Sequence, residues 1–414
     1  MPSPLRIAFI AGEYPPLQGG LGDYTRELAR ALVHLGHDVR VVTRRVEASL
    51  ASNDERAQGE PRVLRVVDGW GWRAWPTVRR AVAGADVVHI QYQTAAYAMH
   101  PFINALPWLL RLTPPLPSPP SLTGKGAGEL GRPLLAITYH DTRIPYLFPK
   151  AGPLRPWVTR LPGRGADLVI ATNAEDGARL QPVARALAYI PIGSNIAPIA
   201  DPSARPAFRA RWGIGPDEPL LVYFGFVNRA KGADILVAAL ARLRAAGLPA
   251  QALMLGGQVG ASDPTNARFL AEVQAQAQSL GVASALVWTD FLPAAEVSAA
   301  LMSADMAVLP YRDGVSLQRG TLMAALAHGL PVVTTRPPVP PPPSPLPRLA
   351  DDLNAVLVAP DDPTALADAV ANLWADASRR VRLGAAAREL SQAFRWERIA
   401  QQHVDWYERL GIRD

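Results

Sequence analysis

The stretch PYRDGVSLQRGTLMAALAHGLPVV, residues 310–333, has the pattern of one βαβ unit. The apolar run DMAVLP leads into it and predicts a buried strand, and the loop that follows carries Asp313, Ser316, Gln318 and Arg319. The run LMAALAHG predicts a short buried helix, capped by Thr321 and stopped by Gly329 before the strand PVVTT. We expect the N-terminus of this helix to offer free amides to an anion.

The same alternation of short β-branched runs and helical patterns continues along the chain, which predicts parallel sheets built from βαβ units. The first half contains the strand candidates LRIAFIAG, DVRVVT, RVLRVV, DVVHIQY, LLAITYH, DLVIATN and ALAYIPIG. The second half contains LLVYFGFV, QALMLGG, ALVWTDF, DMAVLP, PVVTT and AVLVAP. Each set suffices for one doubly wound sheet. The expected fold is therefore α/β, with two Rossmann-like domains that face each other across a cleft.

Changes in composition predict the domain boundaries. Residues 1–194 are expected to form the first Rossmann-like domain, residues 195–219 a linker rich in Pro and small residues, residues 220–393 the second domain and residues 394–414 a C-terminal helix. Two Pro-rich tracts, 113–133 and 336–348, interrupt the pattern. Proline at this density enters neither helices nor central strands, so both tracts are expected to be surface loops.

The composition excludes several classes of protein. A chain of 414 residues without cysteine forms no disulfide or thiolate metal site, which indicates a reducing cytoplasm. The sequence has no apolar run near the roughly 20 residues of a membrane span. It also has no zinc-finger or RNP pattern, so nucleic acid is not an expected partner. The net charge of +6 is compatible with peripheral contact with the inner membrane face, although a general preference for Arg also explains it.

A glycine-rich turn follows the first predicted strand, in GEYPPLQGGLGDYTRELARAL. Gly19, Gly20 and Gly22 allow close backbone approach, and Asp23 or Tyr24 then opens an amphipathic helix. Amides at such a helix start bind anions or polar ligands, although a tight βα turn needs glycine even without a ligand. The spacing differs from the dinucleotide fingerprint, which argues against an NAD enzyme.

A histidine and an aspartate, His140 and Asp141, end the predicted strand of LLAITYHDT. A lone histidine is more often structural than functional. In open parallel sheets, however, ligands bind outside the carboxyl ends of the strands, so this position favours a function for His140.

A basic loop follows the strand of VYFGFVNRAKGADIL, which ends at Gly225. Asn228, Arg229 and Lys231 lie in the loop, directly before a predicted helix. Two cations beside a helix N-terminus predict a clamp for a diphosphate, and the alternative is a solvated basic turn. Lysine is rare in this chain, so its use here favours a function.

These motifs, taken in order, resemble the family 4 (group 1) retaining glycosyltransferases of the GT-B fold. The similarity is carried by GEYPP, GGLGDYTRELARALVHLGHDVRVVT, DVVHIQ, TYHD, ADLVIATNAEDGARL, YIPIGSN, VYFGFVNRAKGADILVAAL, MLGG, SADMAVLPYRDG, ALAHGLPVVTT, LVAPDDPTALADAV and FRWERIAQQHVDWYERL. It covers nearly the whole chain except the two Pro-rich tracts.

The resemblance implies transfer of a sugar from a nucleotide-diphosphate sugar to a glycan, a lipid-linked or a small-molecule acceptor, with retention at the anomeric carbon. It implies no metal and no other cofactor. It assigns catalytic roles to His140, Arg229 and Lys231, and places Tyr24 and Asp141 on the acceptor side. The last helix is implied to pack back on the first domain. The residues that the resemblance assigns to the donor are Gly19, Gly20, Gly225, Asn228, Asp313, Ser316, Arg319, Gly320 and Thr321.

The chain departs from the family in the stretch quoted first. The positions of the two glutamates in the family's E-x7-E motif are occupied by Ser316 and Ala324. The family usually has an arginine directly after the strand-ending glycine. This chain has Phe226 there, and Arg229 is expected to replace that arginine. A lost bond between a carboxylate and ribose costs about 1.5–3 kcal/mol, which weakens donor binding without abolishing it. Because the cationic groups remain, the sequence favours an active transferase with a changed donor site.

Two alternatives stay open at this point. The loss of both glutamates also fits a catalytically silent GT-B protein that serves as a binding or scaffold subunit. A different GT-B activity, such as that of an epimerase or a phosphorylase, is the second alternative. A cofactor-dependent phosphorylase needs a Schiff-base lysine, and Lys231 already has a simpler role.

Overall fold

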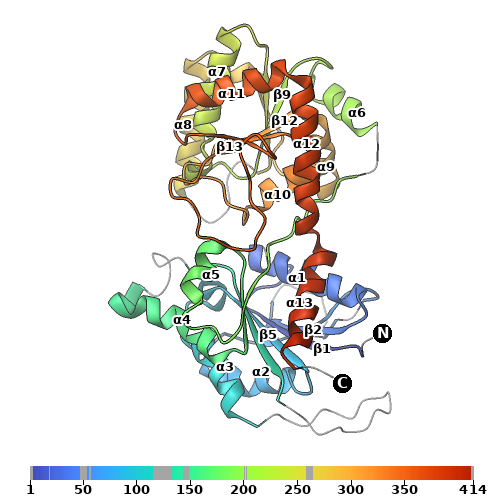
Figure 1. Ribbon diagram of the computed structural model, residues 1–414, viewed down its shortest axis with the longest axis vertical. Helices are drawn as coiled ribbons and strands as arrows, with labels where there is room; N and C mark the ends of the chain where they lie inside the picture. The colour runs from blue at the N-terminus through green and yellow to red at the C-terminus, as the bar shows by residue number, and fades with distance from the viewer. Residues whose placement is uncertain are drawn as a thin grey trace. The chain divides into compact units, whose positions relative to one another are not determined.

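Both halves of the chain fold around a sheet of parallel strands (Figure 1). The computed structural model describes residues 3–17, 19–46, 54–55, 57–114, 132–142, 149–199, 201, 203–257 and 264–411. Packing divides the chain into two units. The first consists of Met1–Gly193, Pro342–Leu346 and Trp396–Asp414, and the second of Ser194–Pro341 and Pro347–Arg395.

The sheet of the first unit has the strand order β3-β4-β2-β1-β5-β6-β7-β8, in which only β3 runs antiparallel to its neighbour among the described strands. Its strands are β1 (Arg6–Ala11), β2 (Asp38–Arg44), β3 (Asp54–Glu55), β4 (Arg62–Val67), β5 (Val87–Tyr92), β6 (Leu134–Tyr139), β7 (Leu168–Ala171) and β8 (Leu187–Tyr189). The sheet of the second unit has the parallel order β11-β10-β9-β12-β13-β14. Its strands are β9 (Leu220–Phe224), β10 (Gln251–Leu255), β11 (Leu286–Trp288), β12 (Met306–Leu309), β13 (Val332–Thr335) and β14 (Val356–Val358). Each predicted strand is present, which confirms the two doubly wound sheets.

Helices connect these strands in both units. In the first unit they are α1 (Gly20–His34), α2 (Trp75–Ala81), α3 (Phe102–Leu112), α4 (Arg155–Gly165), α5 (Ala174–Leu180) and α13 (Trp396–Arg409). In the second unit they are α6 (Ala204–Arg211), α7 (Ala233–Ala245), α8 (Pro264–Ser279), α9 (Ala294–Ser303), α10 (Gly320–Ala327), α11 (Pro363–Ala375) and α12 (Ala377–Ser391). The predicted helical pattern of the last fifty residues is thereby confirmed.

The strand order identifies where a ligand is expected to bind in each unit. In the first sheet β1 lies between β2 and β5, and in the second sheet β9 lies between β10 and β12, so the chain switches direction at these strands. Ligands of open α/β sheets bind outside the carboxyl ends of the strands at such a switch point. The glycine-rich turn after β1 and the basic loop after β9 occupy these two positions.

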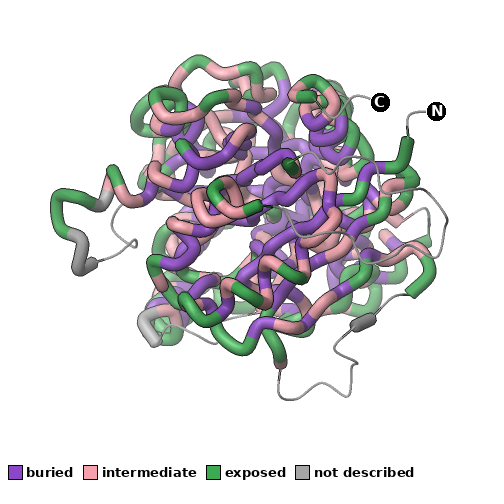
Figure 2. The backbone as a smooth tube through the Cα atoms, turned by 90° about the horizontal axis from the view of Figure 1, so that it is seen from below, coloured by how far each residue is buried: buried purple, intermediate pink, exposed green. Residues whose placement is uncertain are grey.

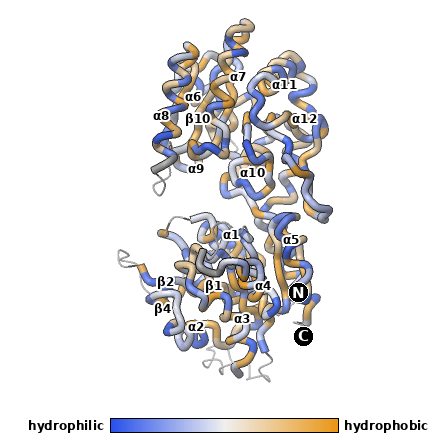
Figure 3. The backbone as a smooth tube through the Cα atoms, turned by 90° about the vertical axis from the view of Figure 1, so that its left-hand side faces the viewer, coloured by the Kyte–Doolittle hydropathy of each residue, from blue (hydrophilic) through white to orange (hydrophobic). Residues whose placement is uncertain are grey.

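The strands are buried on both faces, as a parallel sheet covered by helices requires. Every residue of β5 and of β6 is buried. Figure 2 shows buried stretches through the interior and exposed residues on the outer turns of the helices. Hydrophobic and hydrophilic residues alternate along the helices in Figure 3, which is the pattern of helices packed on a sheet.

Helix α13 completes the hydrophobic core of the first unit, where it lies beside α1 (Figure 1). Ile399, Val404 and Tyr407 belong to the same buried cluster as strand β1. The Tyr407 hydroxyl also lies 2.6 Å from His89 Nδ1 on β5. The last helix therefore packs on the first unit, as the family resemblance implies.

The segment expected to be a linker, residues 195–219, contains helix α6, which packs in the second unit. Buried Arg209 donates to Asp305 at 2.8 Å and to the Gly215 carbonyl at 2.7 Å, and so ties this segment to the strand-β12 side of the sheet. The Pro-rich tract 336–348 forms neither helix nor strand, while residues 115–131 of the other tract lie outside the described residues. Among the described helices, none combines the length and apolarity needed to cross a membrane.

Candidate active site

The basic loop after β9 brings Lys231 against the end of the strand. Gly225 has φ of +115°, a backbone conformation that favours glycine, and a Cβ built there would lie 2.3 Å from Lys231 Nζ. The Asn228 side chain accepts a hydrogen bond from the Lys231 amide at 3.0 Å and so begins the short 3-10 turn Arg229–Lys231. Asn228 therefore fixes the backbone at Lys231.

The second cation beside Lys231 is Arg319, not Arg229. Burial, reinforced by the charge of Arg319, lowers the pKa of Lys231 from 10.5 to about 8. In the part of the chain that the structure describes, no carboxylate pairs with Lys231. An uncompensated, partly buried ammonium is unfavourable by itself, and an anionic ligand would relieve this.

The side chain of Arg229 points elsewhere than the sequence analysis expected. Its guanidinium donates to Glu272 of α8 at 2.6 Å and lies 4.8 Å from the ring centre of Phe269. This side chain is 63% exposed. The structure therefore ties Arg229 to α8, so the expected pairing of Arg229 with Lys231 is not what the structure shows.

Arg319 is fixed by two neighbours on its own loop. It forms an ion pair with Asp313, and its guanidinium stacks 4.0 Å from the ring centre of Tyr311. Its Nε has no hydrogen-bond partner among the described residues. Two of the predicted donor ligands, Asp313 and Arg319, thus hold each other, and the Arg319 Nε is buried.

Helix α10 begins beside this cluster. It starts at Gly320 with Arg319 as the residue before it, and no side chain caps it. The prediction that Thr321 caps the helix is therefore wrong, because Thr321 lies inside the first turn. Its hydroxyl is 3.1 Å from the Tyr311 hydroxyl instead. The amides of Gly320 and Thr321, the first two of α10, form no hydrogen bond to another described residue, and binding of an anion there stays a prediction.

The two positions that lack the family's glutamates differ in their surroundings. The Ser316 hydroxyl accepts a hydrogen bond from the Gln318 amide at 3.3 Å and lies in the loop. Ala324 is fully buried in the apolar cluster under α10. Ser316 thus lies in a polar loop, whereas Ala324 contributes to core packing.

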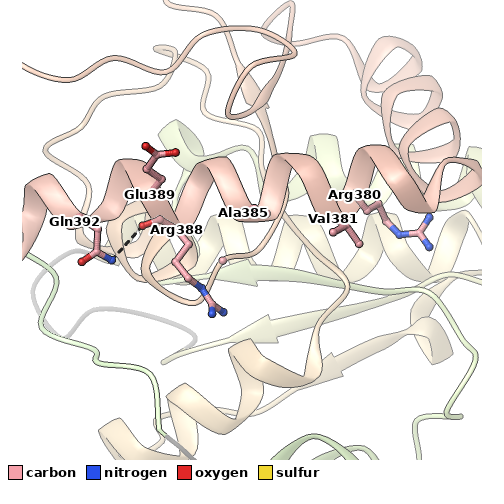
Figure 4. Close-up of a pocket in the computed structure, with 8 residues that line it drawn as sticks. Arg380, Val381, Ala385, Arg388, Glu389 and Gln392 are labelled. Atoms are coloured by element: carbon pink, nitrogen blue, oxygen red, sulfur yellow. Dashed lines mark hydrogen bonds between the residues drawn. The ribbon is translucent and has the colours of Figure 1, made fainter.

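The far end of α10 is held by helix α12. Arg388 of α12 donates to the His328 carbonyl at 3.2 Å, where α10 ends. Figure 4 shows Arg388 and Glu389 leaving α12 on different sides, with the Gln392 side chain bonded to the Arg388 carbonyl. A cation at this position compensates the partial negative charge of the α10 C-terminus. The pocket in Figure 4 is therefore lined by residues of α12 that hold the C-terminal end of α10 in place.

Substituting Gly384 with alanine is expected to destabilise the second unit. Glycine to alanine in a helix normally stabilises by about 0.5–1 kcal/mol. Here a Cβ would lie 2.4 Å from the Gly329 carbonyl oxygen, so α12 must move away from α10. We expect a net loss of about 1–3 kcal/mol in the free energy of unfolding by denaturant titration. Exposed Glu389→Ala is the control, and a G384A variant more stable than wild type would contradict this packing.

In the first unit, the glycine-rich turn after β1 lies against the carboxylate of Glu13. A Cβ at Gly19 would lie 2.1 Å from Glu13 Oε1, so a side chain there would displace the Glu13 carboxylate. Burial raises the pKa of the Glu13 carboxylate, and the amides of Leu21 and Gly22 beside it lower that pKa. Glu13 therefore lies at the N-terminus of α1, which the sequence analysis did not single out. An acidic residue six positions before Gly19 is the signal that indicates it.

His140 lies at the end of β6, as predicted, among buried partners. Its Nε2 donates to Gln91 Oε1 at 2.7 Å, which leaves Nδ1 as an acceptor. Burial lowers the pKa of His140 to about 3, so the ring is neutral at physiological pH. Tyr24 packs edge-on against it at 4.7 Å and is 2% exposed. Tyr24 thus supports His140 and offers no surface to an acceptor, while Asp141 follows half-buried.

Comparison with known proteins shows the family to which both halves of the chain belong. The model of glycosyl transferases group 1 matches residues 218–376, and the model of the glycosyl transferase 4-like domain matches residues 19–193. The chain belongs to the group 1 glycosyltransferases. It is thus an enzyme of the GT-B fold, and its two units correspond to the two matched domains.

Similar curated proteins are themselves glycosyltransferases. The GDP-mannose-dependent alpha-(1-6)-phosphatidylinositol monomannoside mannosyltransferase of Mycolicibacterium smegmatis is 26% identical over 395 residues, 92% of each chain. A D-inositol 3-phosphate glycosyltransferase of Xylanimonas cellulosilytica is 32% identical over 216 residues. That match spans 50% of this glycosyltransferase and 46% of the relative.

Solved structures share the fold of this glycosyltransferase. HepE of Anabaena in complex with UDP superposes with a TM-score of 0.73 at 18% identity, over 98% of this chain and 100% of that chain. The sucrose-phosphate synthase of Thermosynechococcus elongatus gives 0.69 at 23% identity, over 98% of each chain.

Proposed function

We propose that this glycosyltransferase moves a sugar from a nucleotide-diphosphate sugar to a glycan, a lipid-linked or a small-molecule acceptor, with retention of configuration. The observation that carries the proposal is the Lys231 ammonium. It lies against Gly225, next to Arg319 and without a carboxylate partner among the described residues. Two neighbouring cations without full compensation fit a dianionic ligand better than a structural role.

The proposed chemistry places charge compensation at the leaving group. As the bond between sugar and diphosphate breaks, negative charge grows on the phosphate oxygens. Lys231, the neighbouring guanidinium of Arg319 and the first amides of α10 are the groups proposed to stabilise this charge. Such groups catalyse because they are in place before the charge appears.

The same donors support a mechanism that needs no metal. In the described residues, no group of three or more His, Asp or Glu side chains is arranged to hold a metal ion. We assign to neutral His140 a contact with the transferred sugar, through its acceptor Nδ1 and a sugar hydroxyl. Retention rests on the family resemblance. It is tested by proton NMR of early product, whose anomeric coupling should match that of the donor.

The donor is proposed to be bound without the two glutamates typical of the family. At Ser316 a hydroxyl replaces one carboxylate, and at Ala324 the second is absent. The named relatives make GDP-mannose the first donor to test, and HepE makes UDP-glucose the second. Inositol phosphates and phosphatidylinositol glycosides are the first acceptors to offer. Peripheral contact with the inner membrane face stays a prediction.

Nucleotide binding provides the primary test of this function. We expect UDP, GDP or ADP to raise the melting temperature of the purified protein, and the matching nucleotide sugar to be hydrolysed slowly without acceptor. A protein that no nucleotide stabilises and that hydrolyses no donor would instead be a silent GT-B scaffold.

The affinity for that nucleotide is expected to depend on pH through Lys231. Its free-state pKa is about 8, and a bound diphosphate raises this pKa. The affinity for the nucleotide is therefore highest below pH 8. Above pH 8 this affinity falls by about tenfold per pH unit, as long as Lys231 stays protonated in the complex. Titration calorimetry measures this dependence. Lys231→Arg, which stays protonated, is expected to remove the inflection near pH 8, and a flat wild-type profile would contradict the assignment.

A further inference from the structure

The first unit carries an open groove after strand β4 that the proposed donor chemistry does not use. Its volume is about 790 Å³, and it is formed by the turn from Val67 to Ala74, together with Thr77 and His100. It follows the carboxyl end of a sheet strand, where ligands of such sheets bind. The groove is lined by aromatic and polar side chains together.

Trp72 supplies a flat apolar surface to this groove. Its side chain is 55% exposed, which is unusual for the largest aromatic residue. The ring packs against His100 at 6.0 Å and against buried Phe102 at 5.9 Å, both nearly perpendicular to it. Contacts of this geometry fix the indole in place while leaving much of its surface free.

Polar groups surround this ring. His100 Nδ1 accepts the Phe102 amide at 3.1 Å, so the neutral ring carries its proton on Nε2 and can donate to a ligand. Asp68 is largely exposed and is held by Arg45 at 2.9 Å, and the Thr77 hydroxyl also lines the groove. The groove therefore offers one aromatic surface with donors and acceptors at its edge.

The groove is joined to the His140 site by buried hydrogen bonds. Next to Trp72 in the turn, Trp70 donates its indole N–H to the Gly12 carbonyl at 3.0 Å and packs 4.8 Å from the ring of Tyr97. The Tyr97 hydroxyl lies 2.8 Å from the carbonyl of Gln91, whose side chain holds His140. The two features are thus connected by buried contacts within the first unit.

We propose that this groove binds a sugar ring of the acceptor, stacked on Trp72 and hydrogen-bonded by His100 and Asp68. A pyranose combines a face of C–H groups with a rim of hydroxyls, which matches one aromatic surface edged by donors and acceptors. The inference deepens the proposed function and rests on it, since it assigns the acceptor a carbohydrate portion. A lipid acceptor without a sugar would not use this groove.

A membrane surface is the competing occupant, because Trp72 and Arg73 are both exposed. The shape of the site favours a sugar, because Trp72 lines a concave site, not a convex one.

Saturation-transfer difference NMR with the full chain tests the proposal. The probes are the methyl glycosides of mannose, glucose, galactose and N-acetylglucosamine. We expect saturation of at least one of them by wild-type protein, and about tenfold weaker binding by Trp72→Ala. Trp157→Ala is the matched control, because Trp157 on α4 of the same unit is equally exposed, at 53%, and lies outside the groove. Trp72→Phe keeps an aromatic ring, so its affinity for the sugar should lie between those of wild type and Trp72→Ala.

Each outcome decides the assignment. Equal saturation in wild type and W72A, or none of the four sugars saturated by wild type, would overturn it. Loss of binding to phosphatidylglycerol vesicles in W72A with sugar binding unchanged would also overturn it, in favour of the membrane. Once an acceptor is known, W72A should raise its KM about tenfold with donor hydrolysis unchanged. Absent donor hydrolysis in wild type would count against the proposed function alone, since the sugar NMR needs no catalysis.

Discussion

Replacing Lys231 with alanine is expected to reduce sugar transfer by at least about 10²–10³-fold, to near background. The reason is that the ammonium, placed against Gly225, is the donor best positioned for a developing diphosphate charge. The measurement is kcat/KM with the donor identified by the nucleotide screen. Unchanged activity in K231A would remove Lys231 from the site.

The same variant should not lose stability, which separates a catalytic from a structural lysine. The pKa of Lys231 is lower in the folded protein, about 8 against 10.5, so the folded state holds its proton less tightly than the unfolded state. This lysine therefore destabilises the fold below pH 8, and the penalty disappears as the pH rises from 8 to 10.5. At neutral pH, K231A is expected to melt at or above the wild-type temperature, and Lys231→Met, which keeps the packing, clearly above it.

The second large effect is expected for Arg319, which the structure places beside Lys231. Arg319→Ala should lower kcat/KM by about 10²-fold, since it removes a donor to the same phosphate oxygens. Arg229→Ala should have a smaller effect, because its guanidinium is exposed and bonded to Glu272. Arg211→Ala, an exposed arginine paired with Glu296, is the control.

Which of the two variants, R229A or R319A, loses more activity decides whether Arg229, as the sequence predicts, or Arg319, as the structure shows, acts together with Lys231. A larger loss in R229A than in R319A would restore the basic pair that the sequence predicts. Equal losses would mean that both arginines reach the donor.

The sheets could be predicted from the sequence because their signal is local. Each strand is a short β-branched run bounded by turn residues, and the alternation with helical patterns leaves little choice of sheet type. Helix α6 was missed for the opposite reason. Its eight residues, ARPAFRAR, contain a proline, and the contacts of Arg209 that hold it in place reach residues far along the chain.

The sequence predicted which residues lie in the candidate site, but it did not predict all of the contacts between their side chains. Glycine positions and the strand-end His140 follow from the general rule for parallel sheets, and the structure brings them where they were expected. The direction of Arg229 depends on Glu272, which is 43 residues away, and no local pattern carries that information. The predicted Thr321 cap lies two residues past the observed N-cap position, Arg319, which is within the usual uncertainty of a helix boundary.

The position of α13 has a consequence for how the chain is made. The first unit contains residues up to Gly193, yet its core also needs Ile399, Val404 and Tyr407 of α13. At roughly 5–20 residues per second, the ribosome needs tens of seconds to add the about two hundred residues between them. During that time the nascent first unit exposes the apolar surface that α13 later covers, while the second unit is being synthesised. Chaperone binding to stalled nascent chains should therefore persist until α13 has emerged, even though most of the first unit is already present.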